Sequence, residues 1–202
     1  MNQKMKSESL FKPDYNSWRN AQLVYSEYFD IYAIGYKRAA DMLIERVHEE
    51  QIPLDINTLV FPIVFLYRHY LELRLKSIIK EGYAIEGKAV PEKHMHHDLS
   101  NLWNKANELR IKSGVEIEKK DQSFVRSRLD ELSEIDPSSQ AFRYPTRRKR
   151  KGKTGTEPSL PSDLPDLNLR NFSKKITKVS RIFEHIDSMM SIELEQKYYG
   201  EY

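Results

Sequence analysis

The stretch LVFPIVFLYRHYLELRLKSII, residues 59–79, decides the fold of this chain. Wound as a helix, it is apolar on nearly every side, which is typical of a helix that its neighbours bury. Its polar residues are concentrated on an arc of roughly 100° and are Arg68, His69, Glu72 and Lys76. Arg74 stands alone on the other side. We therefore expect a central helix that carries one charged stripe.

Glu72 is the pivot of this stripe. It lies four residues after Arg68 and four residues before Lys76, so it can pair with both along one helix face. One interpretation is a ladder of ion pairs on an exposed side of the helix. The other is a pair of Arg68 with Glu72 inside the bundle or at a dimer seam. We predict the second, because the stripe belongs to an otherwise apolar helix.

The composition limits the possible classes of protein. The 202 residues are enough for one domain with a sizeable core. The 33 basic and 30 acidic residues leave a net charge of +3, so the overall charge names no partner. The absence of cysteine excludes disulfides, thiol catalysis and thiolate metal sites. The sequence contains no long apolar run and no signal-like start, and this predicts a cytoplasmic protein without a membrane segment.

Helical periodicity recurs on both sides of the central stretch. We expect further helices over residues 17–50, 98–112, 119–135 and 167–196. Gly35 could divide the first of these in two, or let another helix approach closely. The tyrosine ladder of the same helix, including Tyr28, Tyr32 and Tyr36, is expected to pack in the core. The central helix is expected to end at Gly82.

This pattern predicts an all-α fold, an up-and-down bundle of five to six helices with no strand pair. Residues 1–14 are expected to be a flexible N-terminus, and residues 15–192 a single helical domain. A basic loop at residues 146–164 is expected to be exposed, and residues 193–202 to form a tail.

The basic loop holds six Lys or Arg in the run RRKRKGK, residues 147–153, followed by Gly, Pro and Ser. Such a run is either a contact to a phosphate backbone, with a steep salt dependence, or simply a solvated loop. The candidate nucleic-acid-binding residues are Arg143, Arg147, Arg148, Lys149, Arg150, Lys151 and Lys153.

Three histidines lie close together at His94, His96 and His97. This triplet suggests zinc, but it supplies at most part of a site, and no other group is spaced as its partner. We expect neither a metal nor a cofactor. His97 is expected to help cap the helix that Asp98 starts or, alternatively, to lie beside the stripe of the central helix.

The chain resembles the HEPN superfamily of helical bundle proteins. The resemblance rests on YRHYLELRLKSII (67–79), HHDLSNLW (96–103) and AFRYP (141–145), followed by a final amphipathic helix. It implies an up-and-down bundle that usually dimerises. Many members are metal-independent endoribonucleases of toxin–antitoxin, phage-defence and CRISPR systems, in which an Arg and a His separated by four to six residues meet across a dimer cleft.

The sequence departs from that spacing, because Arg181 and His185 have three residues between them. Metal-free RNA cleavage requires groups that move protons and a cation that stabilises the phosphorane. The candidates are His185 with Arg181, or His69 and His97 with Arg68. In the second set, Glu72 would orient Arg68 or His69. A solvated helix face is the alternative interpretation of the pair Arg181 and His185.

Three functions remain open from the sequence. The first is a HEPN-like homodimer that binds or cleaves RNA in a bacterial defence or toxin–antitoxin setting. The second is a non-catalytic HEPN-like interaction module, or an antitoxin-type protein with a partner encoded nearby. The third is a binder of a nucleotide or another small anionic ligand, held by Arg68, His97 and Arg143 between helices.

Overall fold

The structure, a computed structural model, describes residues 10, 18, 20–23, 28–149 and 154–199. Its elements are α1 (Phe29–Glu50), α2 (Pro53–Ile85), the 3-10 helix η2 (Glu92–His94), α3 (Leu99–Lys112), α4 (Lys119–Ile135), β1 (Thr146–Arg148), β2 (Thr156–Pro158) and α5 (Leu169–Tyr199). The predicted all-α bundle is confirmed, with five α-helices in the described residues. No helix in that part of the chain is long and apolar enough to cross a membrane.

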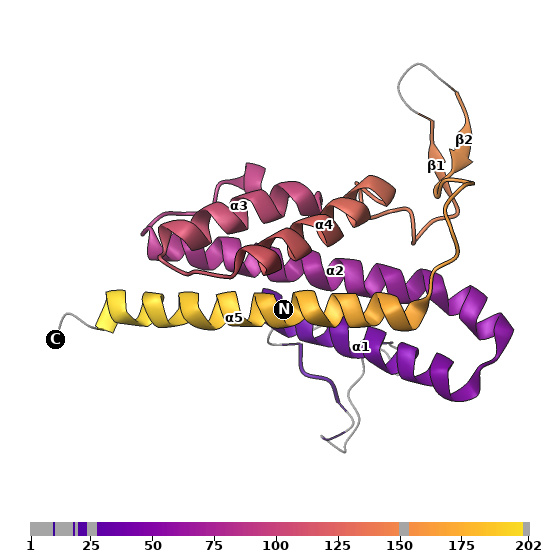
Figure 1. The fold of residues 1–202 in the computed structure, drawn as a ribbon, viewed down its shortest axis with the longest axis horizontal. Helices are drawn as coiled ribbons and strands as arrows, with labels where there is room; N and C mark the ends of the chain where they lie inside the picture. The colour runs from indigo at the N-terminus through magenta and orange to yellow at the C-terminus, as the bar shows by residue number, and fades with distance from the viewer. Residues whose placement is uncertain (1–9, 11–17, 19, 24–27, 150–153, 200–202) are drawn as a thin grey trace.

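Helix α2 is the centre of the bundle, as its apolar sequence predicts. Helices α1, α3 and α5 each pack against it, and α4 packs on α3 and α5 (Figure 1). Its 33 residues span about 50 Å at the usual rise of a helix. Fully buried apolar side chains occur on several of its sides and include Ile63, Tyr67, Leu71, Leu75, Ile78 and Ile79.

Helices α2 and α3 run in the same direction, because the connection over residues 86–98 returns along the bundle before α3 begins. At the start of α3, the carbonyl oxygen of His97 accepts a hydrogen bond from Arg68 in the middle of α2. Near the end of α3, Leu109 lies against Gly82 close to the end of α2. This return places the histidine loop beside the charged stripe of α2.

Helix α1 differs from the prediction at its start. It begins at Phe29, and residues 20–23 form an irregular segment rather than a helix. The helix continues unbroken through Gly35. The prediction that the tyrosine ladder packs in the core is wrong for Tyr28 and Tyr32, which are exposed, whereas Tyr36 is half-buried. These two tyrosines are exposed because other faces of α1, with Ala33 and Ala40, enter the core.

Helix α2 also ends later than predicted, at Ile85 rather than at Gly82. The glycine has a packing role instead. A Cβ atom at Gly82 would lie 2.7 Å from the Cβ of Leu109, so only a glycine lets α3 come this close. The turn that follows uses Gly87, whose φ of 69° is in the left-handed region that favours glycine.

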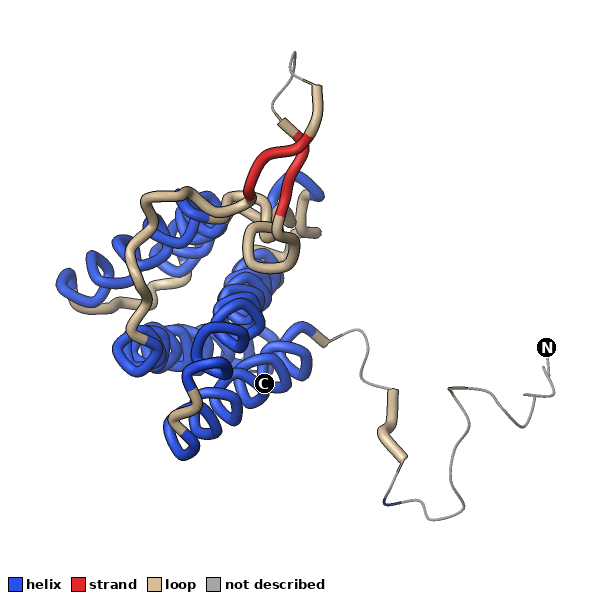
Figure 2. The backbone as a smooth tube through the Cα atoms, turned by 90° about the vertical axis from the view of Figure 1, so that its right-hand side faces the viewer, coloured by secondary structure: helices blue, strands red, loops and turns tan. Residues whose placement is uncertain are grey.

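The predicted absence of a strand pair is wrong. Strands β1 and β2 pair antiparallel, with Arg147 opposite Glu157, and the hairpin projects from the bundle (Figures 1 and 2). The amide of Ser159 donates to the carbonyl of Pro145 at 3.0 Å and closes the base of the hairpin. These strands have three residues each and no buried face, so they leave no alternation of apolar and polar residues in the sequence.

Candidate functional site

The charged stripe of α2 lies inside the bundle. Arg68 and Glu72 are 0% and 1% exposed, and Arg68 Nη1 lies 3.3 Å from Glu72 Oε2. Lys76 Nζ donates to the other oxygen of Glu72, Oε1, at 2.8 Å. The predicted buried pair is therefore confirmed, and the alternative of a ladder on an exposed side is wrong. The stripe is buried because the loops before α3 and after α4 cover it.

Arg68 binds those two loops to α2. Its Nε donates to the carbonyl oxygen of Asp136 at 3.0 Å, and its Nη2 donates to that of His97 at 2.9 Å. Asp136 in turn accepts hydrogen bonds from the amides of Gln140 and Ala141 through Oδ1, so it shapes the turn after α4. Because Arg68 has no exposed surface and its donors face protein acceptors, it positions other groups rather than contacting a ligand.

Glu72 orients His97. The Nδ1 atom of His97 lies 2.8 Å from Glu72 Oε1. Burial raises the pKa of Glu72, but the hydrogen bonds and charges of Lys76 and His97 outweigh burial and hold this pKa below its ordinary value. An ionised carboxylate only accepts hydrogen bonds, so Nδ1 carries the proton and donates it. When the ring is uncharged, this tautomer has its lone pair on Nε2. The side chain of His97 is 64% exposed, so solutes can reach the ring.

His69 lies in an aromatic group on the same side of α2. Its ring meets Tyr36 edge-on, with centroids 4.5 Å apart, and stacks on Phe65 at 5.7 Å. Burial lowers the pKa of His69, with smaller effects from nearby charges, so the ring is neutral at pH 7. The group extends to the hairpin, because Arg143 lies over Phe65, 5.5 Å from its centroid. Glu72 thus orients His97 and Arg68, with no hydrogen bond to His69 among those described.

Arg181 and His185 occupy a different place. Both are exposed on α5 and line a hollow of about 690 Å³, together with Lys178. Its remaining lining is mostly acidic, with Glu116, Glu118 and Asp121 at the connection before α4 and its first turn. Lys178 pairs with Asp121 across this hollow at 3.3 Å. This mixture of charges does not favour a phosphate backbone over other ligands.

The basic hairpin is exposed in the part that the structure describes. Arg147, Arg148 and Lys149 are all exposed, and Arg147 pairs with Glu157 at 3.0 Å. The other predicted cations of this run, Arg150, Lys151 and Lys153, lie outside the described residues. Arg143 precedes β1 and is exposed at its base.

The three histidines of the predicted loop have different partners. His94 packs near the ring of Tyr83, with centroids 6.0 Å apart, whereas the Nδ1 of His96 accepts from the amide of Asp98. His97 faces Glu72, so it lies beside the stripe of α2, and Asp98 caps α3 by accepting from the amide of Asn101. Across the described residues, no group of three or more histidine, aspartate or glutamate side chains is placed to hold a metal ion.

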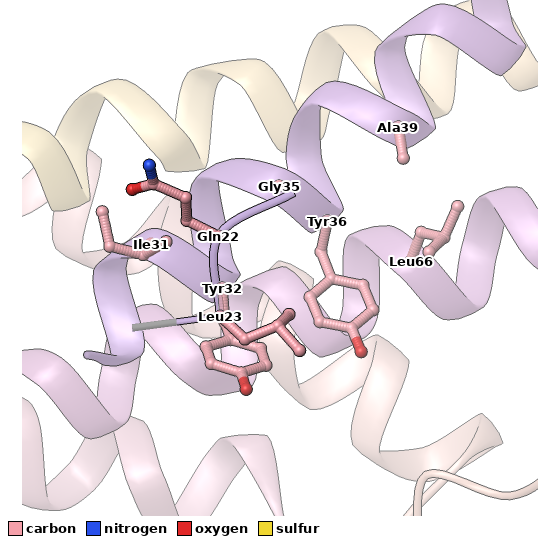
Figure 3. Close-up of a pocket in the computed structure, with 8 residues that line it drawn as sticks. All are labelled: Gln22, Leu23, Ile31, Tyr32, Gly35, Tyr36, Ala39 and Leu66. Carbon is pink, nitrogen blue, oxygen red and sulfur yellow. The ribbon is translucent and has the colours of Figure 1, made fainter. Parts of the chain in front are cut away.

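A further hollow, of about 440 Å³, lies on α1 (Figure 3). It is lined by Ile31, Tyr32, Tyr36 and Ala39 of that helix, with Leu66 of α2 and residues 22–23 beside them. None of its described lining residues is charged. It therefore offers no cation to a phosphate or carboxylate, and it is a different place from the one predicted for a small anionic ligand, which would be held by Arg68, His97 and Arg143.

Three side chains near the charged stripe of α2 and the base of the hairpin were not predicted as site residues from the sequence. Asp136, Phe65 and Tyr144 join it through contacts with residues far away in the chain or through the unpredicted hairpin base. The sequence 136–139, Asp-Pro-Ser-Ser, indicated only that α4 ends there. Nothing in the spacing of residues 136–139 indicates that Asp136 contacts α2.

Comparison with known proteins found no matching family model, no similar curated protein and no similar solved structure. The class defined by fold and site is therefore an all-α bundle with a buried charge cluster, an exposed histidine held by a glutamate, and a projecting basic hairpin.

Proposed function

We propose that this protein binds RNA through the β1–β2 hairpin. The observation that carries the proposal is the exposure of Arg147, Arg148 and Lys149 on a hairpin that stands away from the bundle (Figure 1). The sequence between the strands adds Arg150, Lys151 and Lys153.

The local charge supports this proposal better than the overall charge does. Residues 147–153 contain six cations and no acid, in a chain whose net charge is only +3. Such a cluster attracts a phosphate backbone and releases its counterions, which makes the affinity strongly salt-dependent. RNA is proposed, rather than another polyanion, because of the resemblance to the HEPN superfamily.

The test is the affinity for a labelled RNA across a series of salt concentrations. The doubly substituted variant Arg148→Ala/Lys149→Ala should bind more weakly than the wild type. Each lost phosphate contact should flatten the plot of log K against log salt by about 0.7 for a single strand. The matched control is Lys119→Ala/Lys120→Ala, which removes the same charge from exposed positions at the start of α4. Absence of RNA binding at low salt, or an equal loss in the control, would contradict the proposal.

A second candidate function is metal-independent cleavage of the bound RNA, and the hydrogen bond between His97 and Glu72 favours it. Such cleavage needs a base that accepts the proton of the 2′-hydroxyl group, an acid for the leaving oxygen, and positive charge near the phosphorane. His97 Nε2 has the lone pair of a base, and the proton that it takes from the 2′-hydroxyl group can pass on to the leaving oxygen. Lys76, hydrogen-bonded to the same oxygen of Glu72, adds positive charge beside it. Arg68 acts in this proposal only by positioning Glu72 and the backbone of His97.

Cleavage of a labelled RNA pool with EDTA present tests this second function. His97→Ala should abolish cleavage, and Glu72→Gln should slow it and alter its pH profile, because the amide orients the ring less well than a carboxylate. His185→Ala is the matched control, since His185 lies in the other hollow on α5. If His185→Ala abolishes cleavage and His97→Ala does not, the site belongs to α5 instead.

The resemblance also leads us to propose a homodimer in a bacterial defence or toxin–antitoxin setting. Light scattering of the purified protein tests the dimer directly. Stable assembly with a protein encoded nearby, without RNA affinity, would support the alternative of a non-catalytic interaction module.

A further inference from the structure

A hollow of about 360 Å³ lies at the base of the basic hairpin. Its walls come from three places in the chain: Phe61 of α2, the segment of Arg143, Tyr144 and Pro145 before β1, and Pro158 with Ser159 at the end of β2. This volume is within the range of roughly 300–1,000 Å³ that is usual for small-ligand pockets. The hollow therefore has room for a small planar group.

The lining of this hollow is suited to planar rings. Phe61 and Tyr144 are 45% and 50% exposed, although large aromatic side chains are usually covered. The guanidinium of Arg143 lies 5.1 Å from the centroid of the Tyr144 ring, and its Nη2 donates to the tyrosine hydroxyl at 3.1 Å. The same guanidinium also lies over Phe65, 5.5 Å from the centroid of its ring. Exposed aromatic rings next to an arginine plane are the surface on which nucleobases stack.

Ser159 gives the hollow an unused polar group. The residue is 2% exposed, and its hydroxyl oxygen has no hydrogen-bond partner among the described residues. Buried polar groups are nearly always hydrogen-bonded, so an unpartnered hydroxyl beside a pocket is unusual. The hydroxyl turns about a single bond, and it can serve as donor or acceptor for an edge of a ligand ring.

We propose that this hollow binds one unpaired base of the RNA whose backbone the hairpin holds. The inference rests on the proposed RNA binding and adds a preference for single-stranded over fully paired RNA. The basic hairpin supplies backbone affinity directly next to the hollow, and the rings of Tyr144 and Phe61 supply stacking. A base inside a duplex is already stacked and paired, so it cannot enter without first being extruded.

The experiment compares one short RNA as a single strand and as a full duplex, with the wild type and Tyr144→Ala. Stacking of a base on an aromatic residue predicts that Tyr144→Ala weakens single-strand binding by roughly 5- to 150-fold. Duplex binding should stay within about twofold, because it depends on backbone charge. Tyr144→Phe retains the ring and should retain most of the single-strand affinity. A 2-aminopurine base in the strand should lose fluorescence on binding to the wild type and not to Tyr144→Ala.

The control variant is Tyr198→Ala, which removes a tyrosine of similar exposure near the C-terminal end of α5. Circular dichroism and the melting temperature of each variant check that the fold is retained. If the wild type binds neither RNA at low salt, the proposed function itself fails. If it binds both and Tyr144→Ala has no effect, RNA binding stands and the base site is overturned. An equal loss on both RNAs, or binding of an aromatic peptide to the hollow instead of RNA, would also overturn it.

Discussion

Helix α2 takes part in two clusters of charged side chains that differ in the balance of acids and bases. The Arg68 cluster, on the side of α3 and the loop after α4, contains Arg68, Lys76, Glu72, Asp136 and His97. Its two permanent cations match its two acids, and every one of the five groups has a described partner. The Arg74 cluster, on the side of α1 and α5, contains Arg74, Asp30, Asp187, Glu81 and Ser191. In it, one cation faces three acids.

The pKa values differ in the same way. In the Arg68 cluster, Lys76 and His97 outweigh burial, and the pKa of Glu72 lies below its ordinary value. In the Arg74 cluster, the pKa of Glu81 is raised to about 7, mainly by burial, and the charges of Asp187 and Asp30 act in the same direction. The hydrogen bond from Ser191 and the charge of Arg74 act in the opposite direction. Burial also raises the pKa of Asp187, although Arg74 lies 2.9 Å away. Matched charge stabilises an ionised carboxylate, and unmatched charge favours the protonated form.

The largest expected effect comes from removing Arg68 from the Arg68 cluster. Arg68→Ala should lower the free energy of unfolding by about 3–5 kcal/mol, because it leaves Glu72 Oε2 and two loop carbonyl oxygens without their donor. Arg74→Ala should cost less, about 1–3 kcal/mol, because its partner Asp30 is nearly half exposed and can be hydrated. Urea unfolding at pH 7 measures both values.

The control for these two variants is Arg46→Ala, which removes an exposed arginine of α1 whose partner, Glu50, lies four residues further along the same helix. Its effect should stay within about 0.5 kcal/mol. If Arg74→Ala proves as costly as Arg68→Ala, the two clusters do not differ in the way that their hydrogen bonds imply.

The second prediction concerns Glu81, whose substitution should raise the free energy of unfolding instead of lowering it. A carboxyl group whose folded pKa is above its unfolded value of about 4.5 stabilises the fold fully only below that value. This contribution is lost as the pH rises through about 7. Glu81→Gln mimics the protonated form, so it should raise the free energy of unfolding at pH 8 by about 1–2 kcal/mol and change it little at pH 5. Urea unfolding across this pH range measures the difference.

The matched control for Glu81 is Glu49→Gln, at an exposed position of α1. It should give a pH profile parallel to that of the wild type. Glu72 provides the opposite case within the same helix. Because its folded pKa is lowered, the stability that it contributes is present above about pH 4.5 and is lost as the pH falls below that value. If Glu81→Gln lowers the free energy of unfolding at pH 8, it contradicts the interpretation that an excess of acids disfavours an ionised Glu81 in the Arg74 cluster.

The sequence predicts the side-chain contacts within α2, but not the contacts of α2 with distant parts of the chain. The spacing of Arg68, Glu72 and Lys76 is enough to predict their pairing, because residues four apart on a helix are neighbours. The contact of Arg68 with Asp136 joins residues 68 positions apart, and it depends on how the connections turn. Sequence periodicity contains no information about that path.

The same reasoning explains why the raised pKa of Glu81 and the base of the hairpin could not be predicted from the sequence. Glu81 is one more glutamate near the end of a helix, and its raised pKa arises mainly because the packed bundle buries it, with a further increase from the charges of Asp187 and Asp30. The base of the hairpin escapes for another reason: two strands of three residues, exposed on both faces, show no alternation to detect. The bundle itself is predictable, because several long amphipathic segments must bury their apolar faces against one another.

The smallest expected effect tests the one hydrogen bond that Glu81 receives. Ser191 Oγ donates to Glu81 Oε1 at 2.6 Å, whereas Glu81 Oε2 has no partner among the described residues. Ser191→Ala should lower the free energy of unfolding by about 0.5–1.5 kcal/mol. The loss should be larger at pH 8 than at pH 5, because the hydroxyl stabilises the ionised carboxylate and its removal raises the pKa of Glu81. In the Glu81→Gln background the substitution should lose this pH dependence, since the side chain no longer titrates. A loss that is the same at every pH in the wild-type background would mean that Ser191 acts by packing alone, and that Glu81 is already protonated across the range.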